Sequence, residues 1–348
     1  YAVNLYDTSK PRKYDKPYNQ VTFRTAGPSA MSIPVGLDDD LSAMLLNNDV
    51  DPEVPEGTEY YLPAGSSYRV TPFALMKGFR LVGSRDGVKP IVVLEGSWSI
   101  AEGSYLSSLE FDNIEFRHEA NNNYFMNTSK AYTIENVSFV NCDFISLRRG
   151  FWRHQSANAK YIMNLEMEGC RFEGCGWQTS AYGTFNLQSF DKDNGVSYDQ
   201  VDRAIFRNCT FSNDNDGTNG YGWGNLFYAP YMDKPIELEY KNVTIYNYSR
   251  NQRLINIESA VGSKLVMQGI LLASPCGDLY AIGANTTTTF SDNYTTADYA
   301  LGGSKMNATD LEITADKLFA DPVNGDLTIK DTSSPIVNSR AGDTRWLP

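Results

Sequence analysis

The chain has 348 residues, of which 41% are hydrophobic and 21% are charged, so it is long enough to bury a large core in one domain. No apolar run is long enough to cross a membrane. The net charge of −12 disfavours nucleic acid and anionic membranes as partners, because both require a positively charged surface, but a local basic patch remains open to an anionic glycan.

The first 27 residues predict a hairpin. Alternating apolar residues at Tyr1, Val3 and Leu5 precede a charged turn, and a second apolar stretch follows at 21–25. The stretches YAVNLYD and VTFRTAGP resemble the last two strands of a fibronectin type III domain. The alternative is a hairpin that packs on the main domain, which we place at residues 28–348. The chain begins without Met, so we expect an upstream segment.

Residues 38–48 predict a short helix. Asp38, Asp39 and Asp40 stand at its start, where carboxylates complement the helix dipole, and the apolar residues that follow are spaced for one face. We interpret the aspartates as capping groups, with calcium binding as the alternative. Such a helix would cover the open end of a stacked sheet, whose bare backbone edge would otherwise aggregate.

Three short strands are expected next, at 59–62, 80–82 and 90–94. Glycine and proline residues separate them. We interpret them as the first, irregular coils of a repeat.

A ten-residue pattern then recurs, most plainly as LEMEGCRFEG at 165–174. Apolar and polar residues alternate, a Gly or Asn breaks the alternation at position five, and a second small polar residue usually stands at position ten. The six expected copies are 109–118, 132–141, 165–174, 204–213, 238–247 and 265–274. Position five is occupied by Asn113, Asn136, Gly169, Asn208, Asn242 and Gly269.

A second set of short apolar strands lies between the copies, at 124–126, 150–153, 184–187, 226–228 and 254–257. Two or more strands per repeat, without a helical period, are typical of stacked coils. The sequence therefore predicts an all-β parallel solenoid. Asparagine suits its corners, because it tolerates left-handed backbone and bonds to its copies in neighbouring coils.

The five cysteines have no spacing that predicts a disulfide scaffold. Cys170 and Cys209 follow position five, while Cys142 and Cys175 follow position ten, so we interpret them as buried free thiols stacked along the core. With only two histidines, zinc is not expected, and no cofactor is predicted. Three position-five asparagines also begin Asn-X-Ser/Thr glycosylation motifs, but the repeat already accounts for them.

Residues 285–299 are rich in Thr and Asn and predict a loop. The repeat as a whole resembles the right-handed single-stranded parallel β-helices of the pectin-lyase-like superfamily. The ending LFADPVNGDLTIKDTSSPIVNSRAGDTRW, at 318–346, resembles the C-terminal tail of a β-helix family of unknown function. That family occurs in the surface glycan-utilisation systems of gut bacteria. The resemblance covers about residues 28–348.

This resemblance implies a secreted or outer-membrane surface protein, anchored to lipid through an upstream segment, that binds or processes a polysaccharide or oligosaccharide. It implies outer-membrane glycan-uptake partners, and we expect a monomer. Fold alone does not give function, because β-helices of this type include lyases, polygalacturonases and non-catalytic binders.

The segment RRGFWRH at 148–154 fits lyase chemistry best. Elimination at a uronic acid needs a base, a cation that neutralises the carboxylate and an acid for the leaving oxygen. Arg149, Arg153 and His154 are the candidate catalytic residues, with Arg148 to bind a carboxylate and Trp152 to stack on a sugar ring. We expect Arg153 to point outward, because burying an arginine would be costly.

Aromatic and amide side chains in the later insertions predict a platform for sugars. Stacked coils would place successive insertions side by side, as in an extended groove. The candidate substrate-binding residues are Trp177, Tyr182, Asn186, Gln188, Tyr221, Trp223 and Tyr228. The alternatives are that these aromatics cover the core under long loops, and that Arg149 and Arg153 pair with Glu166 and Glu168 of neighbouring coils.

Inverting glycoside hydrolases of this fold need several close aspartates, for which Asp191, Asp193, Asp214 and Asp216 are candidates. The same loops would suit calcium, which prefers clustered oxygens. The preferred hypothesis is a cell-surface β-helix that binds polysaccharide without cleaving it. The first alternative is a polysaccharide lyase, and the second is a structural spacer or adhesin that binds no glycan.

Overall fold

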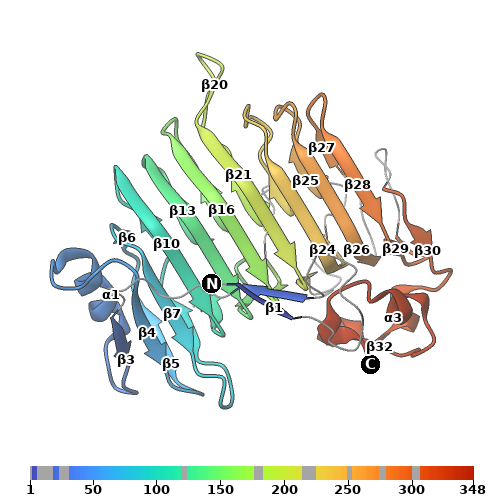
Figure 1. Ribbon diagram of the computed structural model, residues 1–348, viewed down its shortest axis with the longest axis horizontal. Coiled ribbons are helices and arrows are strands. Elements are labelled where there is room, and N and C mark those ends of the chain that lie inside the picture. Colours follow the sequence, from blue (N-terminus) through green and yellow to red (C-terminus); the bar gives the residue numbers. More distant parts are fainter. Residues whose placement is uncertain are drawn as a thin grey trace.

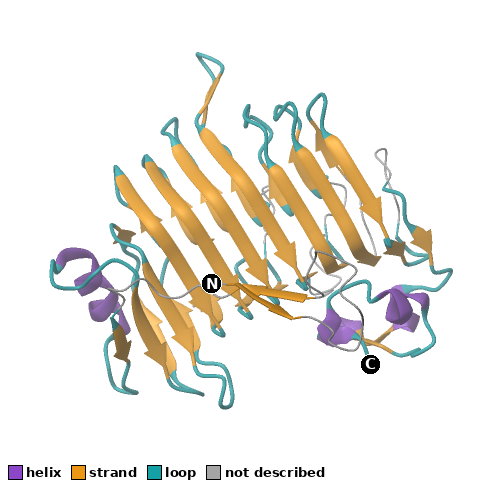
Figure 2. Cartoon of the chain, in the orientation of Figure 1, coloured by secondary structure: helices purple, strands orange, loops and turns teal. Residues whose placement is uncertain are grey.

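The computed structural model describes residues 31–118, 124–175, 183–213, 225–248, 253–273, 280–299 and 306–348, and the backbone of residues 2–5 and 19–22. Its main body is a parallel β-solenoid in which each coil stacks on the one before it (Figure 1). The predicted all-β fold with an N-terminal capping helix is confirmed. The described helices lie towards the two ends of the stack (Figure 2), and none of them is long and apolar enough to span a membrane.

Each coil contributes up to three strands, which form two continuous rows and a separate third sheet. The first row contains β3 (Ser32–Pro34), β4 (Thr58–Leu62), β7 (Phe79–Gly83), β10 (Ser104–Asp112), β13 (Tyr132–Val140), β16 (Lys160–Glu168), β21 (Asp199–Arg207), β24 (Glu237–Tyr246), β26 (Lys264–Ala273) and β28 (Thr287–Ser291). The second row contains the ends of β24 and β26 and β5 (Ser67–Val70), β8 (Ile91–Leu94), β11 (Glu115–His118), β14 (Asp143–Ile145), β17 (Arg171–Glu173), β22 (Thr210–Ser212), β29 (Tyr294–Thr295) and β30 (Thr309–Asp310).

The third sheet is the predicted second set of short strands. It contains β12 (Tyr124–Thr128), β15 (Gly150–His154), β18 (Phe185–Leu187), β23 (Phe227–Tyr228), β25 (Ile255–Ile257) and β27 (Tyr280–Ile282). The pair β6 (Ala74–Leu75) and β9 (Ser99–Ile100) lies in the coils before it. All these pairings are parallel, so residues at equal positions in successive coils share a face.

The helix α1 (Leu41–Val50) covers the first coil, as predicted. The side chain of Asp40 accepts a hydrogen bond from the backbone N–H of Ala43 (3.0 Å), which makes it the N-cap. Leu41 and Leu45 are fully buried in the main core. The interpretation of this aspartate as a capping group is therefore confirmed.

The N-terminal hairpin is also present. Strand β1 (Ala2–Leu5) pairs antiparallel with β2 (Asn19–Thr22). Its relation to a fibronectin type III module, and the domain boundary after residue 27, stay predictions.

Left-handed residues turn the corner between the first and second rows. Their φ angles lie between 49° and 65° at Asn113, Asn141, Gly169, Asn208, Asn242, Gly269 and Asp292. Asparagine and glycine tolerate this conformation better than other residues. The amide of Asn141 also donates to the Asn113 side chain of the coil before it (2.6 Å). These residues therefore turn the predicted corners, and the Asn141–Asn113 pair forms one step of the predicted ladder.

The second copy of the repeat lies five residues later than the predicted 132–141. Val137 pairs with Leu109 and Leu165, so that copy spans 137–146 and Asn141, not Asn136, turns the corner. Asn136 lies within β13 instead. The error arose because one coil carries two asparagines in similar apolar surroundings.

The corrected register also changes the cysteine pattern. Cys142 joins Cys170 and Cys209 just after the corner, whereas Cys175 follows the next corner. All four are buried free thiols, as predicted, and burial raises the pKa of Cys142 and Cys209. Cys276 lies outside the described residues.

Aromatic rings fill the core in columns that follow the three sheets. Equal positions in neighbouring coils hold equal residues, so the rings lie one above another. Stacked pairs include Phe111 with Phe139 (4.7 Å between ring centres), Phe144 with Phe172 (4.8 Å) and Phe125 with Phe151 (5.0 Å).

The prediction of a loop at residues 285–299 is wrong, because these residues form another coil. They contain β28 and β29, which both pair with β26. Asn293 replaces part of the ladder, because its amide accepts from the backbone of Ile270 (2.9 Å) and donates to that of Met267 (3.0 Å). The threonines are β-branched and favour strands, so a threonine-rich segment does not by itself indicate a loop.

After β30, the C-terminal segment, residues 311–348, returns along the outside of the second row. Its elements after β30 are α2 (Ala315–Leu318), β31 (Phe319–Asp321), the 3₁₀ helix η1 (Pro322–Asn324), β32 (Asp326–Ile329), α3 (Pro335–Ser339) and the 3₁₀ helix η2 (Thr344–Trp346). Phe319 and Leu327 pack with Tyr246 and Leu271 of the row in a second, smaller core.

Candidate functional site

Strand β15 places the predicted site residues on two different sides of the sheet. Phe151 and Trp152 both donate their backbone N–H to the carbonyl of Thr184 (2.8 and 3.0 Å), an irregularity that turns both side chains inward. Both are fully buried. Arg153 is half-buried and points outward, as expected, with its guanidinium 5.4 Å from the ring centre of Tyr124. Trp152 therefore offers no surface to a sugar ring, contrary to expectation.

His154 belongs to a buried chain of hydrogen bonds. Trp152 Nε1 donates to the Tyr132 hydroxyl (3.3 Å), and this hydroxyl lies 2.6 Å from His154 Nε2. His154 Nδ1 lies 2.6 Å from the carboxylate of Asp199. Because a carboxylate only accepts, Nδ1 carries the proton and Nε2 of the neutral ring accepts from Tyr132.

Burial lowers the pKa of His154 below its ordinary value, although the Asp199 carboxylate acts in the opposite direction. Both side chains are fully buried. The imidazole is therefore a neutral part of the core, and in this conformation it does not reach a polysaccharide outside the solenoid.

The three candidate catalytic residues do not converge on one groove. Arg148 and Arg149 lie half-buried in the turn before β15, Arg153 lies on the outer face, and His154 lies inside. Glu166, one of the carboxylates considered as an ion-pair partner, pairs with Arg203 of the neighbouring coil (3.0 Å). The other, Glu168, accepts from the Asn208 side chain (2.5 Å).

The outer face of the third sheet carries a row of polar side chains, which we call the outer row. Strand pairing aligns its members in the order Asn127, Arg153, Asn186, Tyr228 and Asn256. Oδ1 of Asn127 and Nδ2 of Asn186 are buried and make no hydrogen bond with the described part of the chain. Asn186 and Asn256 are buried, with 1% and 5% of their surface exposed, whereas Asn127, Arg153 and Tyr228 are partly exposed and are the members of the row that can meet a ligand.

A patch around Tyr228 adds aromatic surface to the outer row. Phe190, from the hairpin of β19 (Phe190–Asp191) and β20 (Val196–Ser197), stacks on Tyr231 with 4.3 Å between ring centres. Both rings are partly exposed, as is Gln188, whose amide donates to Asn186 (2.5 Å). Burial raises the pKa of Tyr228 above its ordinary value, so its hydroxyl stays protonated near neutral pH.

Three of the predicted binding residues, Asn186, Gln188 and Tyr228, thus lie together beside Arg153. Trp177, Tyr182, Tyr221 and Trp223 lie outside the described residues. Sequence reasoning missed Asn127 and Asn256. Their signal was present, because each stands as a polar residue within a short apolar strand, as Arg153 and Asn186 do.

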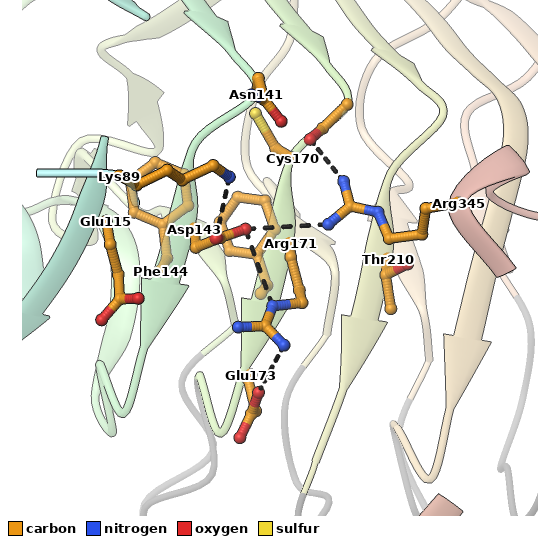
Figure 3. Close-up of polar contacts among 12 residues, drawn as sticks. Lys89, Glu115, Asn141, Asp143, Phe144, Cys170, Arg171, Glu173, Thr210 and Arg345 are labelled. Carbon is orange, nitrogen blue, oxygen red and sulfur yellow. Dashed lines mark hydrogen bonds and ion pairs between the residues drawn. The ribbon is translucent and has the colours of Figure 1, made fainter. Parts of the chain in front are cut away.

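A second polar cluster, the Asp143 junction, lies on the second row (Figure 3). The Asp143 carboxylate lies 2.9 Å from Lys89 and 3.7 Å from both Arg171 and Arg345. Arg345 also donates to the Gly169 carbonyl, which ties the C-terminal segment to an inner coil.

The charges of the Asp143 junction balance. Arg171 also pairs with Glu173 (3.4 Å), and Arg345 pairs with Asp343 (2.8 Å). Three cations thus face three carboxylates. Burial raises the pKa of Asp343 despite the nearby Arg345 guanidinium. We interpret this cluster as a structural junction and not as a site for anions.

The predicted aspartate and calcium sites receive no support from the described residues. Asp191 accepts from the backbone of Asp193 (2.9 Å) and from the side chain of Asn194 (2.7 Å), so it closes the β19–β20 turn. Asp214 and Asp216 lie outside the described residues. Among the residues that are described, no group of three or more His, Cys, Asp or Glu side chains is placed to hold a metal ion.

Comparison of the chain with protein-family models, curated proteins and solved structures found no match.

Proposed function

We propose that this protein binds a polysaccharide along the outer row of the third sheet, without cleaving it. The observation that carries the proposal is the row itself: amides, a guanidinium and a tyrosine occupy equal positions in successive coils. Sugar chains are bound by this mixture of hydrogen-bonding groups and aromatic faces. The stacked Phe190–Tyr231 pair supplies further aromatic surface beside Tyr228.

The geometry of the row suits an extended ligand. Neighbouring strands lie about 4.8 Å apart, so the four steps from Asn127 to Asn256 span about 19 Å. The sugar units of a polysaccharide repeat along the chain, as the polar residues repeat along the row. Several weak contacts can therefore add up along one bound chain. Arg153 would bind a carboxylate or a pair of hydroxyls of the glycan.

Lyase action is a weaker proposal for this face. A base and a neutralising cation must reach the same sugar ring, yet Arg153 and His154 lie on opposite sides of β15. The described residues thus support a role for Arg153 in binding rather than in proton transfer.

The setting that we propose is the cell surface. The tail at 318–346 resembles that of pectin-lyase-like β-helices from bacterial glycan-utilisation systems, and the coil repeat is compatible with that superfamily. The partners would then be outer-membrane proteins that take up the bound glycan.

The proposal predicts that Tyr228→Ala weakens polysaccharide binding. Affinity electrophoresis in gels that contain single polysaccharides measures the retardation of the full chain. We expect at least one polysaccharide to retard the wild type and Tyr228→Ala to lose about tenfold in affinity, roughly 1.4 kcal/mol.

Tyr105→Ala is the matched control, because Tyr105 is a 56% exposed tyrosine on β10 of the first row. Its variant should bind like the wild type. Equal losses in both variants, or no retardation by any polysaccharide, would contradict the proposal and favour a spacer. Ultraviolet absorbance from an unsaturated uronic acid product would instead show a lyase.

A further inference from the structure

A small cavity lies where the C-terminal segment crosses the second row. Its volume is about 170 Å³, and the 3₁₀ helix η1 forms one wall while β17, β22 and β24 form the other. The residues that matter for its chemistry are Glu173, Ser212, Asn213, Tyr246, Asn324 and Gly325. They belong to neither the outer row nor the third sheet.

Asn213 lines this cavity with a side chain that has no hydrogen-bond partner in the described part of the chain. The residue is 97% buried, and neither Nδ2 nor Oδ1 of its amide bonds to any described residue. Its backbone is fully used, since its N–H donates to Tyr246 (3.2 Å) and its carbonyl accepts from Asn247 (3.3 Å). Buried polar groups are nearly always paired, so this amide needs an explanation.

The residues at equal corners of the neighbouring coils explain why the Asn213 amide has no partner among the described residues. Asn213 stands at a corner where the next coil has Asn247, whose amide bonds to the Asn213 backbone. The coil before it has Gly174 at this position, which has no side chain to offer. The Asn213 amide is thus a donor and an acceptor that the described coils do not use.

The remaining walls supply complementary chemistry. The carboxylate of Glu173 stands at the rim, 37% exposed, and is held by Arg171 at 3.4 Å (Figure 3). Tyr246 is buried and packs edge-on against Phe319, which fixes its ring. The carboxylate and the amide offer acceptors and a donor to hydroxyl groups, and the aromatic ring offers an apolar face.

Charge and size narrow the ligand class. The described residues that line the cavity include the Glu173 carboxylate, which Arg171 pairs, and no cationic side chain, so the lining supplies no counter-charge for a uronic acid or a phosphate. Pockets for drug-sized molecules run from roughly 300 to 1,000 Å³, so this cavity has room for a single small ring and not for a chain. We propose that it binds one neutral monosaccharide unit, the end or a branch of a glycan, with Asn213 as its main hydrogen-bonding residue.

This inference does not rest on polysaccharide binding by the outer row. The two sites use different residues and different faces, so either can fail alone. A chain bound along the outer row needs no free end, whereas the cavity accepts only an end or a branch.

Saturation-transfer NMR on the full chain tests the inference. The probes are a neutral hexose, a pentose and a 6-deoxyhexose, each free in solution at millimolar concentration. We expect transfer to at least one of them. Asn213→Leu should reduce the affinity at least tenfold while its melting temperature stays level or rises, because it removes an unpaired buried amide without opening a cavity.

Val323→Trp keeps the test decisive if Asn213→Leu fails to fold. Val323 lines the cavity and is 60% exposed, so a larger side chain there should block the cavity without entering the core. Val261→Trp, at a 50% exposed position away from the cavity, is the matched control. Loss of transfer in Val323→Trp alone supports the inference. Absence of transfer to every sugar, or equal transfer in the two tryptophan variants, overturns it.

Discussion

At the residue scale, burial decides which side chains of β15 can act on a ligand. The outward position of Arg153 was predictable, because a guanidinium is costly to bury. The inward position of Trp152 was not, since tryptophan is common both in cores and on sugar-binding surfaces. His154 was harder still: its partners Tyr132 and Asp199 lie 22 and 45 residues away and meet it only in the folded coil stack.

The neutral, buried His154 predicts a pH dependence of stability. Its pKa is lowered in the folded protein, whereas the unfolded chain takes up the proton near pH 6.5. The unfolded state therefore binds more protons as the pH falls from about 7 to 5, and the free energy of unfolding decreases by up to about 1.4 kcal/mol per pH unit. Urea unfolding at several pH values measures this slope.

The control for this slope is His154→Gln, which keeps a donor and an acceptor but does not titrate. Its free energy of unfolding should fall less steeply than that of the wild type between pH 7 and 5. Lys160, whose pKa burial lowers to about 8, titrates in a higher window and does not interfere. Parallel slopes in the two proteins would show that His154 is not held neutral.

At the element scale, the corners determine the register. The alternation, the short third-sheet strands and the stacking were all predictable, because each recurs in the sequence. The predicted second copy is wrong because Asn136 and Asn141 each stand two and four residues after apolar side chains, and only strand pairing distinguishes them. The threonine-rich coil at 285–299 is likewise identified only by its strand pairing with β26, and its sequence alone predicts a loop.

The register predicts different costs for two asparagine variants. Asn141→Ala places alanine in a left-handed conformation (φ 52°) and removes the ladder bond to Asn113, so it should lose roughly 2–3 kcal/mol. Asn141→Gly should lose less, because glycine adopts this conformation freely. Asn136→Ala, within β13, should cost about 1 kcal/mol or less. Chemical denaturation ranks the three, and a larger loss for Asn136→Ala would refute the corrected register.

At the scale of the whole molecule, other parts of the chain already cover the first coil and part of one side of the solenoid. Helix α1 covers the first coil, and the C-terminal segment covers part of the second row (Figure 1). Ion pairs such as Arg203 with Glu166 link coils of the first row. On the third sheet the described coils align Asn127, Arg153 and Tyr228 as partly exposed polar side chains on one face, which is why we propose this face for a polymer.

The solenoid was predictable as a whole because residues of the same type recur at the same positions of each repeat. The site was predictable only in part. Gln188 and Tyr228 were found through their chemistry. The unpaired amide of Asn213 had no sequence signal, because it results from a glycine at the same corner of another coil. Whether a buried polar group lacks a partner depends on the residues that the fold places around it, and a single sequence does not show these neighbours.

The most direct test of polysaccharide binding by the outer row is a titration with size-fractionated oligosaccharides of the polysaccharide that binds best. Isothermal calorimetry gives the affinity for each length. We predict that affinity rises with length until the oligosaccharide spans the row of about 19 Å, and that Tyr228→Ala flattens this rise. Affinity that is independent of length, or equally reduced in Tyr105→Ala, would contradict the account.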